Sequence, residues 1–290
     1  RFTAPANTGK PSGMDLDNNG STTDPQDAFG FGRHEGQYGM LVLSRFPIEK
    51  EFIRTFQTFL WRDMPGALLP VDPSSGKPYY SDAELAILRL SSKSFWDVPI
   101  KVPAAAGGQP WQLHLLCSHP TPPVFDGPED RNGRRNHDEV RLVADYISPD
   151  RSDYLVDDAG ARGGLDADAA FVILGDLNCD PLGGQGIAGT MEQLLEHPRV
   201  NSDFTPSSAG GERVARQFAD QNADHRGHLK HVTSNFTGEG HGNLRIDYAL
   251  PSRGLKVTGS GVFWPTPGEP GAEAITASDH RLVWIDIAAP

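Results

Sequence analysis

The 290-residue sequence predicts a single layered α/β domain over residues 1–290. Strand-like apolar segments alternate with helical segments and long loops, and residues 171–174 are fully apolar, as in the centre of a covered sheet. The 32 glycines and 24 prolines favour ordered loops over a helix bundle. Residues 1–38, rich in Gly, Asn, Asp and Ser, are expected to form a loop-rich opening.

Periodicity places the expected elements along the chain. A helix is predicted at 134–147, where Val140, Val143, Ala144 and Ile147 keep helical spacing, and a second at 191–196. Single strands are expected at 40–44, 53–61, 111–117, 171–174 and 282–287, and strand pairs at 85–90 with 98–102 and at 244–250 with 255–263.

The net charge and the distribution of apolar residues bear on whether the protein binds nucleic acid or spans a membrane. The net charge of −12 and the pI near 5.2 argue against a broad electrostatic surface for nucleic acid. A bound divalent cation or a local arginine cluster can reverse the sign at one site, so nucleic acid is disfavoured but not excluded. No apolar run approaches the ~20 residues that span a bilayer.

Two cysteines, Cys117 and Cys179, are too few for a disulfide scaffold. They are interpreted either as small buried residues or, in an exported protein, as a disulfide. The opening sequence Arg1-Phe2-Thr3-Ala4-Pro5 resembles the interior of a longer protein.

Five short segments carry groups suited to phosphate chemistry. In GDLN, Asp176 and Asn178 follow an apolar strand and could handle a water and a phosphate oxygen, although the same residues favour turns. In SDH, Asp279 can ligate a hard cation and His280 can transfer a proton, although the tripeptide also suits a polar turn.

Asp247, in RIDY, is an acid within an apolar strand and needs a partner, either a histidine or an arginine such as Arg245. His119 follows a strand and begins a Pro-rich loop. It is interpreted either as a second imidazole near the phosphate or as a structural histidine. Arg131, Arg134 and Arg135 could contact phosphate oxygens or form a solvated helix face.

The order of these motifs, SH, GDxN, RxDY and SDH, resembles the endonuclease/exonuclease/phosphatase superfamily, and its secreted bacterial members in particular. The superfamily includes deoxyribonucleases, apurinic endonucleases, inositol polyphosphate 5-phosphatases and neutral sphingomyelinases. The resemblance covers about residues 40–287 and implies a four-layered α/β sandwich of two packed mixed sheets flanked by helices.

The resemblance also implies roles. Asp176 would activate the attacking water, with Asn178 on the phosphate or the metal. His280, held by Asp247, would contact the scissile phosphate, and His119 would be the second imidazole. Asp279 and Asp176 would bind Mg²⁺, with Mn²⁺ or Ca²⁺ as alternatives, and Arg134, Arg135 and Asn178 would contact the substrate phosphate.

The family's N-terminal strands, one with an asparagine and one with a glutamate that ligates the metal, have no counterpart before Met40. Glu35 lies in a Gly-rich stretch and does not match that glutamate. We expect these strands on a removed or separate segment, so that the protein's own N-terminal fragment is an expected partner.

A second candidate metal site, for calcium, is the run Asp15, Asp17 and Asn19 before Gly20, which matches the first half of a calcium-binding loop. Gln26 occupies the twelfth position instead of Glu, and a turn is the alternative interpretation.

The leading functional hypothesis is a secreted or periplasmic Mg²⁺-dependent phosphatase or phosphodiesterase that acts on a small or lipid-linked phosphoester. A Mg²⁺-dependent nuclease and a non-catalytic binding domain of the same fold are the alternatives.

Overall fold

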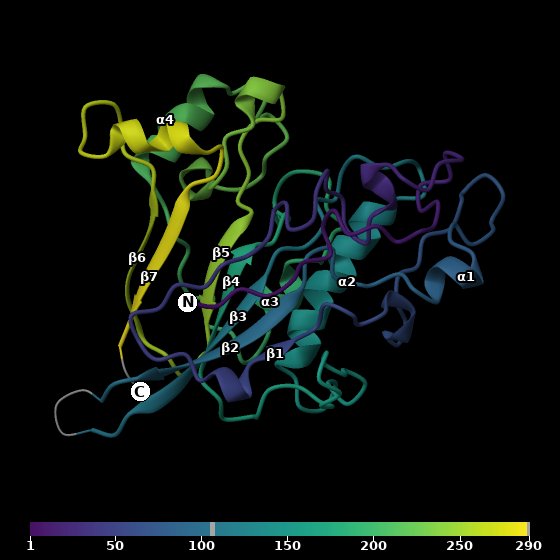
Figure 1. Cartoon of the computed structure of the whole chain (residues 1–290). Helices are drawn as coiled ribbons and strands as arrows, with labels where there is room; N and C mark the ends of the chain where they lie inside the picture. The colour runs from purple at the N-terminus through teal and green to yellow at the C-terminus, as the bar shows by residue number, and fades with distance from the viewer. Residues whose placement is uncertain (105–107, 289–290) are drawn as a thin grey trace.

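Two β-sheets form the centre of the molecule in a computed structural model that describes residues 1–104 and 108–288 (Figure 1). The first is mixed and runs β1-β2-β3-β4-β5, with β3 and β4 parallel and the other neighbours antiparallel. Its strands are β1 (Arg54–Thr55), β2 (Phe95–Val102), β3 (Trp111–Ser118), β4 (Phe171–Asp176) and β5 (Asp247–Pro251). The second sheet is an antiparallel pair, β6 (Val257–Phe263) and β7 (Leu282–Ile287).

The helices are few and mostly short. They are α1 (Asp82–Leu85), α2 (Arg131–Tyr146), α3 (Glu192–Leu195) and α4 (Ala209–Gln217). Within the described residues, six 3-10 helices lie in the connections, at Pro25–Asp27, Lys50–Phe52, Trp61–Asp63, Leu229–His231, Thr237–Glu239 and Ala272–Ala277. None of the described helices is both long and apolar enough to cross a membrane.

The main core lies between α2 and the five-stranded sheet. Val140, Val143 and Ile147 of α2 belong to the same buried cluster as Leu116 of β3 and Ile173 of β4. This explains the helical spacing in the sequence, because one face of α2 must be apolar to cover the sheet.

The opposite face of the five-stranded sheet packs on the second sheet. Ile100, Leu113 and Val172 form a cluster that Ile285 and Ile287 of β7 join. The predicted α/β sandwich of two packed sheets with helices is therefore confirmed, although the second sheet is an antiparallel pair and not a mixed sheet.

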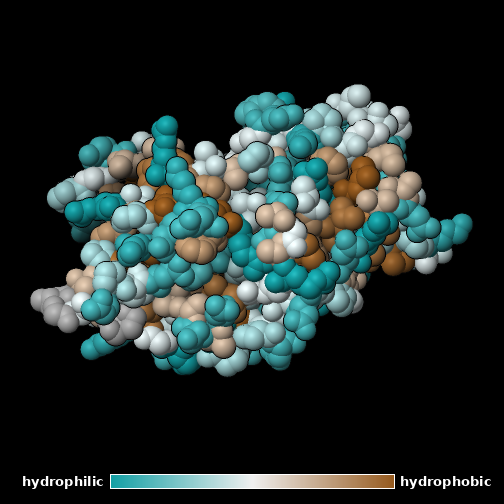
Figure 2. All heavy atoms as spheres, turned by 60° about the horizontal axis from the view of Figure 1, so that its bottom comes forward, coloured by the Kyte–Doolittle hydropathy of each residue, from teal (hydrophilic) through white to brown (hydrophobic). Residues whose placement is uncertain are grey.

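The outer face of β6–β7 exposes large apolar side chains. Phe263 and Leu282 are register partners, and Trp284 lies two residues further along β7 on the same face. All three are exposed to solvent. On the face that Figure 2 shows, the surface is mostly hydrophilic, with apolar atoms in separate areas.

Several predicted strands differ from the structure. Residues 40–44 form only an isolated bridge, Phe2 with Val42, and residues 53–61 are a strand only at Arg54–Thr55. There, Asp158 accepts the backbone N–H groups of Gln57 and Thr58, so a side chain replaces a strand partner.

The two predicted strand pairs are wrong in their partners. Leu85 ends α1, which begins with a capping box between Ser81 and Glu84, so 85–90 does not pair with β2. β2 pairs with β1 and β3 instead. Likewise β5 pairs with β4, and β6 pairs with β7.

Cys117 and Cys179 are both buried free thiols, so the disulfide interpretation is not realised. Burial raises the pKa of each thiol to about 12, with nearby aspartates adding to the shift. Both groups therefore stay protonated and unreactive at neutral pH.

Candidate active site

The sheet topology brings three of the sequence motifs to one edge. β3 and β4 are parallel, so His119 and Asp176 emerge at the same edge. β5 runs the other way and begins there, and its first residue, Asp247, is the register partner of Asp176. Residues more than 120 positions apart in the sequence thus meet because of strand order alone.

Gly175 is required for this meeting. It has φ +148°, and a Cβ at this position would lie 1.8 Å from the carbonyl oxygen of Ser118. Any side chain would push β4 away from the end of β3, and Asp176 away from His119. The glycine of the GDLN motif is therefore explained by close strand approach.

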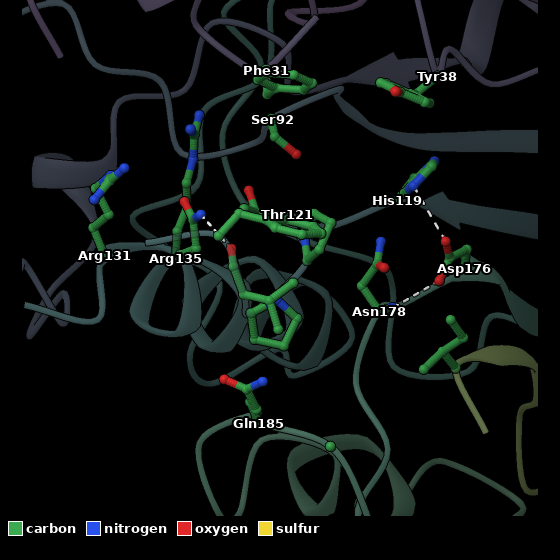
Figure 3. Close-up of a pocket in the computed structure, with 18 of the residues that line it drawn as sticks. Phe31, Tyr38, Ser92, His119, Thr121, Arg131, Arg135, Asp176, Asn178 and Gln185 are labelled. Atoms are coloured by element: carbon green, nitrogen blue, oxygen red, sulfur yellow. Dashed lines mark hydrogen bonds and ion pairs between the residues drawn. The ribbon is translucent and has the colours of Figure 1, made fainter. Parts of the chain in front are cut away.

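Asp176 lies near two imidazoles, those of His119 and His280, and Figure 3 shows its contact with His119. Its Oδ2 is 3.4 Å from Nε2 of His119 and 3.8 Å from Nε2 of His280. Its Oδ1 accepts the backbone N–H of Asn178 at 2.9 Å, and Asn178 adopts φ +54°, a left-handed conformation that asparagine tolerates. The GDLN motif thus forms a turn and also places Asp176 beside the polar side chains of the site.

Asp247 pairs with His280, with both carboxylate oxygens 3.1 Å from Nδ1. It also accepts a hydrogen bond from the Thr233 hydroxyl at 2.8 Å. Arg245, the alternative partner, lies instead over the ring of Tyr248. The pair fixes the orientation of the imidazole, so that Nε2 is directed to the side of Asp176.

Burial and mutual repulsion shift the acid–base properties of these groups. Burial, with the charge of Asp247, raises the pKa of Asp176 to about 7. Burial alone would lower the pKa of His280, but the hydrogen bond and charge of Asp247 raise it to about 9. Burial, with the charge of Lys93, holds the pKa of His119 well below 6.5. Near neutral pH the site therefore contains one charged and one neutral imidazole.

These shifts predict how stability of the metal-free protein depends on pH. The raised pKa of His280 means that the folded state binds this proton more tightly than the unfolded chain, whose histidine titrates near 6.5. The contribution of His280 to the free energy of unfolding is complete below pH 6.5 and is lost as the pH rises through about 9. The melting temperature in EDTA should fall more between pH 7 and 9 in the wild type than in His280→Asn.

That comparison cancels the opposing effect of Lys93, whose lowered pKa of about 8 makes stability rise with pH above 8 in both proteins. Equal slopes in the two proteins would contradict the assigned His280 shift.

Lys93 is a site residue that sequence reasoning missed. Its side chain is buried, lines the same cavity as Asp176, and forms no ion pair within the described residues. Its Nζ donates to the carbonyl oxygen of Pro120 at 3.1 Å. Burial lowers its pKa to about 8, against the opposing charges of Glu139 and Asp176. Nothing in the local sequence Ser92-Lys93-Ser94 signals this burial.

Helix α2 supports the site loops through buried polar side chains. Glu139 accepts the backbone N–H groups of Ser92 and Thr121, each at 2.6 Å. Asn136 donates to the carbonyl oxygens of Thr121 and Leu177. The helix therefore holds the loops that follow β3 and β4 and the segment before β2 in fixed relative positions.

The carboxylates of Asp176 and Asp247 are placed so that they could bind a divalent cation. Asp176, Asp247 and His280 each offer a ligand atom, and these atoms lie within 4.8 Å of one another. Two carboxylates this close repel, as the raised pKa of Asp176 records, and a hard cation with oxygen preference would relieve the repulsion. The cluster therefore suits a metal ion, although its identity is open.

Other predicted metal ligands lie outside this cluster. Asp279 is exposed and lines the cavity, but its carboxylate is not part of the group. Its role as a ligand stays a prediction. Glu35 is exposed and is not among the cavity-lining residues of the described chain.

The predicted phosphate-binding arginines are placed differently from each other. Arg134 donates to the carbonyl oxygen of Glu129 and does not line the cavity, so its position does not favour a phosphate contact. Arg135 lines the cavity but is buried, and it donates to three backbone carbonyl oxygens, those of Phe29, Arg89 and Leu90. Its guanidinium mainly anchors those segments.

The proposed calcium loop forms a network of Asx-type turns. Asp15 and Asp17 accept the backbone N–H of Asn19, and Asp15 accepts that of Gly20. Carboxylates of Asp15, Asp17 and Asp27 lie within 4.8 Å of one another, and the side-chain amide of Asn19 donates to Asp17. The turn interpretation accounts for these contacts, and calcium binding stays a prediction.

The site opens into a cavity of about 790 Å³. His119, Asp176, Asn178, Asp279 and His280 lie at one end of its lining. Figure 3 shows Arg131 and Arg135 on the side opposite His119 and Asp176. This volume is within the range of small-molecule sites.

A sequence model of the endonuclease/exonuclease/phosphatase family matches residues 4–280. The chain therefore belongs to this family, whose members include phosphatases, nucleases and sphingomyelinases that hydrolyse phosphoesters with a metal ion. The resemblance inferred from motif order is thus confirmed. No curated protein matches the sequence.

Some solved structures are similar to the chain at low identity. An endonuclease/exonuclease/phosphatase from Beutenbergia cavernae DSM 12333 is 16% identical, with a TM-score of 0.44 over 84% of this chain and 46% of that one. Sphingomyelinase C from Streptomyces griseocarneus is 12% identical, with a TM-score of 0.34 over 68% and 55%. A mannosyl-6-phosphatase from Bacteroides thetaiotaomicron VPI-5482 is 12% identical, with a TM-score of 0.37 over 69% and 59%. The chain thus spans about half the length of these proteins.

Proposed function

We propose that this protein is a metal-dependent phosphatase or phosphodiesterase in which water attacks a phosphate in line with the leaving oxygen. The observation that carries the proposal is Asp176, whose carboxylate is within 4 Å of two imidazoles, one of them held by a second carboxylate. A lone structural turn would not need this set of buried, mutually repelling groups.

Asp176 is the proposed general base. It takes a proton from the attacking water as the new bond between the water oxygen and phosphorus forms. Without a metal, burial and the charge of Asp247 raise the pKa of this carboxyl to about 7, so it holds a proton more readily than an ordinary aspartate does.

The imidazoles lie beside the base and bind the phosphoryl oxygens. His280, charged at neutral pH because of Asp247, stabilises the negative charge on the phosphoryl oxygens, and the leaving oxygen takes a proton from solvent water as the ester bond breaks. His119 is neutral and donates a hydrogen bond to the phosphate. Asp247 keeps Nε2 of His280 directed at the reacting groups.

A divalent cation held by the carboxylates of Asp176 and Asp247 would polarise the phosphoryl oxygen and neutralise charge. Mg²⁺ suits these oxygen ligands, and Mn²⁺ or Ca²⁺ are alternatives. A glutamate ligand from a separate N-terminal segment, as the resemblance implies, stays a prediction, as does export from the cell.

The test uses 4-nitrophenyl phosphate and bis(4-nitrophenyl) phosphate as generic monoester and diester substrates. Turnover of one of them should disappear in EDTA and return with Mg²⁺ or Mn²⁺. No turnover of either ester, with metal binding seen by calorimetry, would replace the proposal with a binding domain. Preferential nicking of plasmid DNA would indicate the nuclease.

Lys93 is proposed to supply a positive charge to the bound phosphate. Replacing it with methionine keeps the apolar stem and removes the charge. We expect kcat/KM to fall about 10–100-fold, which is the value of one charge-assisted contact. The melting temperature should not fall in parallel, because a buried cation without an ion pair costs stability. Unchanged kcat/KM would show that Lys93 has only a structural role.

A further inference from the structure

The catalytic groups occupy only one end of the cavity, and the remainder has apolar walls. Leu16, Ala28 and Phe31 come from the N-terminal segment, and Pro122, Pro123 and Phe125 come from the loop after His119. We propose that this part of the cavity binds an apolar organic group of the phosphoester, of the size of one or two rings or a short alkyl chain. The proposal rests on the proposed function and names its substrate class.

Exposed aromatic side chains at the cavity support the proposal. Phe31 is 44% exposed, Tyr38 is 50% exposed and Phe125 is 75% exposed, although all three line the cavity. Figure 3 shows the rings of Phe31 and Tyr38 along one side of the pocket. Apolar surface left in water is unfavourable, and its concentration at one cavity marks a binding surface.

Backbone strain coincides with the same rim. Tyr38 has φ +61° and Phe125 has φ +67°, and both conformations are costly for bulky residues. Asn178, beside the catalytic carboxylate, shares this left-handed conformation. Such strain persists where the surrounding structure imposes it, and it is concentrated at ligand sites. Here it holds two aromatic rings at the mouth of the cavity.

Two buried hydroxyls provide polar anchors between the apolar walls. Ser92 Oγ and Thr121 Oγ1 are buried without a hydrogen-bond partner, and both residues line the cavity. Figure 3 places Ser92 and Thr121 between the arginines and the catalytic groups. A few unsatisfied polar groups among apolar walls are the usual composition of a small-molecule site. These hydroxyls can bind oxygens near the ester linkage.

The far end of the cavity does not suit a second phosphate. Arg135 uses its guanidinium on backbone carbonyl oxygens, and Arg131 pairs with Glu129 and stacks on Tyr79. The fork of Arg135 is thus occupied, and Glu129 takes up one nitrogen of Arg131 and opposes its charge. The occupant of the apolar part is therefore an uncharged organic group and not a polyphosphate.

The experiment measures binding by calorimetry of methyl phosphate, phenyl phosphate and hexyl phosphate, in EDTA, so that the proposed metal-dependent hydrolysis does not consume the ligands. Phenyl or hexyl phosphate should bind about ten-fold more tightly than methyl phosphate, because each buries apolar surface that methyl lacks. Preference for phenyl over hexyl would identify an aromatic substrate, and the reverse an alkyl or lipid-derived one. Equal affinity for all three would overturn the proposal.

The variant Phe31→Ala/Phe125→Ala should abolish the preference and leave methyl phosphate affinity unchanged. Phe52→Ala is the matched control, because Phe52 is 55% exposed and lies outside the cavity lining. A preference that survives the double substitution would also overturn the proposal.

A parallel rate measurement separates this inference from the proposed function. 4-Nitrophenyl phenyl phosphate and 4-nitrophenyl methyl phosphate share one leaving group and differ in the retained group. Turnover of both at one rate, with equal binding of the three ligands, would leave the hydrolase and remove the apolar subsite. No turnover of either diester or of 4-nitrophenyl phosphate in Mg²⁺, with preferential binding of phenyl phosphate, would leave the subsite and remove the hydrolase.

Discussion

Replacing Asp176 with asparagine should lower kcat by about 10³-fold, the usual size of the loss when a general base is removed. Asparagine keeps the shape of the side chain but cannot accept a proton from water. It also removes one of the two crowded carboxylates, so Mg²⁺ affinity should fall as well. Steady-state rates on the substrate that proves active and calorimetry with Mg²⁺ would measure both effects.

Folding is not expected to suffer, because Asn178 and the imidazoles can still bond to the amide oxygen. Relief of repulsion from Asp247 should instead maintain or raise the melting temperature. Asp220→Asn is the matched control, since Asp220 is exposed and outside the cavity lining. Turnover within a few-fold of wild type in Asp176→Asn would refute the assigned role.

Replacing Glu139 with alanine should lower the free energy of unfolding by about 3–5 kcal/mol, as removal of one partner from a buried charged network does. Glu139 is only 3% exposed and accepts two backbone N–H groups, those of Ser92 before β2 and Thr121 after β3. Its loss leaves both donors unsatisfied and leaves Asp176 as the remaining opposing charge near the buried Lys93. Urea unfolding followed by circular dichroism would give the difference.

Activity should fall further than stability explains, because Ser92 and Thr121 flank Lys93 and His119. Glu139→Gln should be intermediate, since the amide retains one acceptor but presents a donor to the second N–H. Glu212→Ala, on the exposed face of α4, is the control and should change stability little. A Glu139→Ala protein as stable as wild type would show that α2 does not hold the site loops.

The sequence was most informative where one physical signal dominates. β3, β4 and β7 were predicted because apolar strands in a covered sheet leave continuous or alternating patterns. Motif order then identified the family and named Asp176, Asp247 and His280 before their distances were known. Register between Asp176 and Asp247, by contrast, depends on which strands pair, and local patterns do not encode pairing.

The missed residues share one physical cause. Lys93 and Glu139 are charged, and charged residues are normally exposed, so no local signal predicts their burial. Each is buried because of partners distant in the sequence, such as Pro120 and Thr121. Arg135 was misjudged for the same reason, since its carbonyl partners come from three separate positions.

The second sheet has a consequence for handling the protein. β7 pairs with β6 along one edge, and within residues 1–104 and 108–288 no other strand pairs with it. Beside this edge lie the exposed side chains of Phe263, Leu282 and Trp284. Free backbone donors next to apolar side chains act as a template for intermolecular strand addition. Concentrated samples should therefore self-associate through β7, and rate constants that describe a single molecule are best obtained in dilute solution.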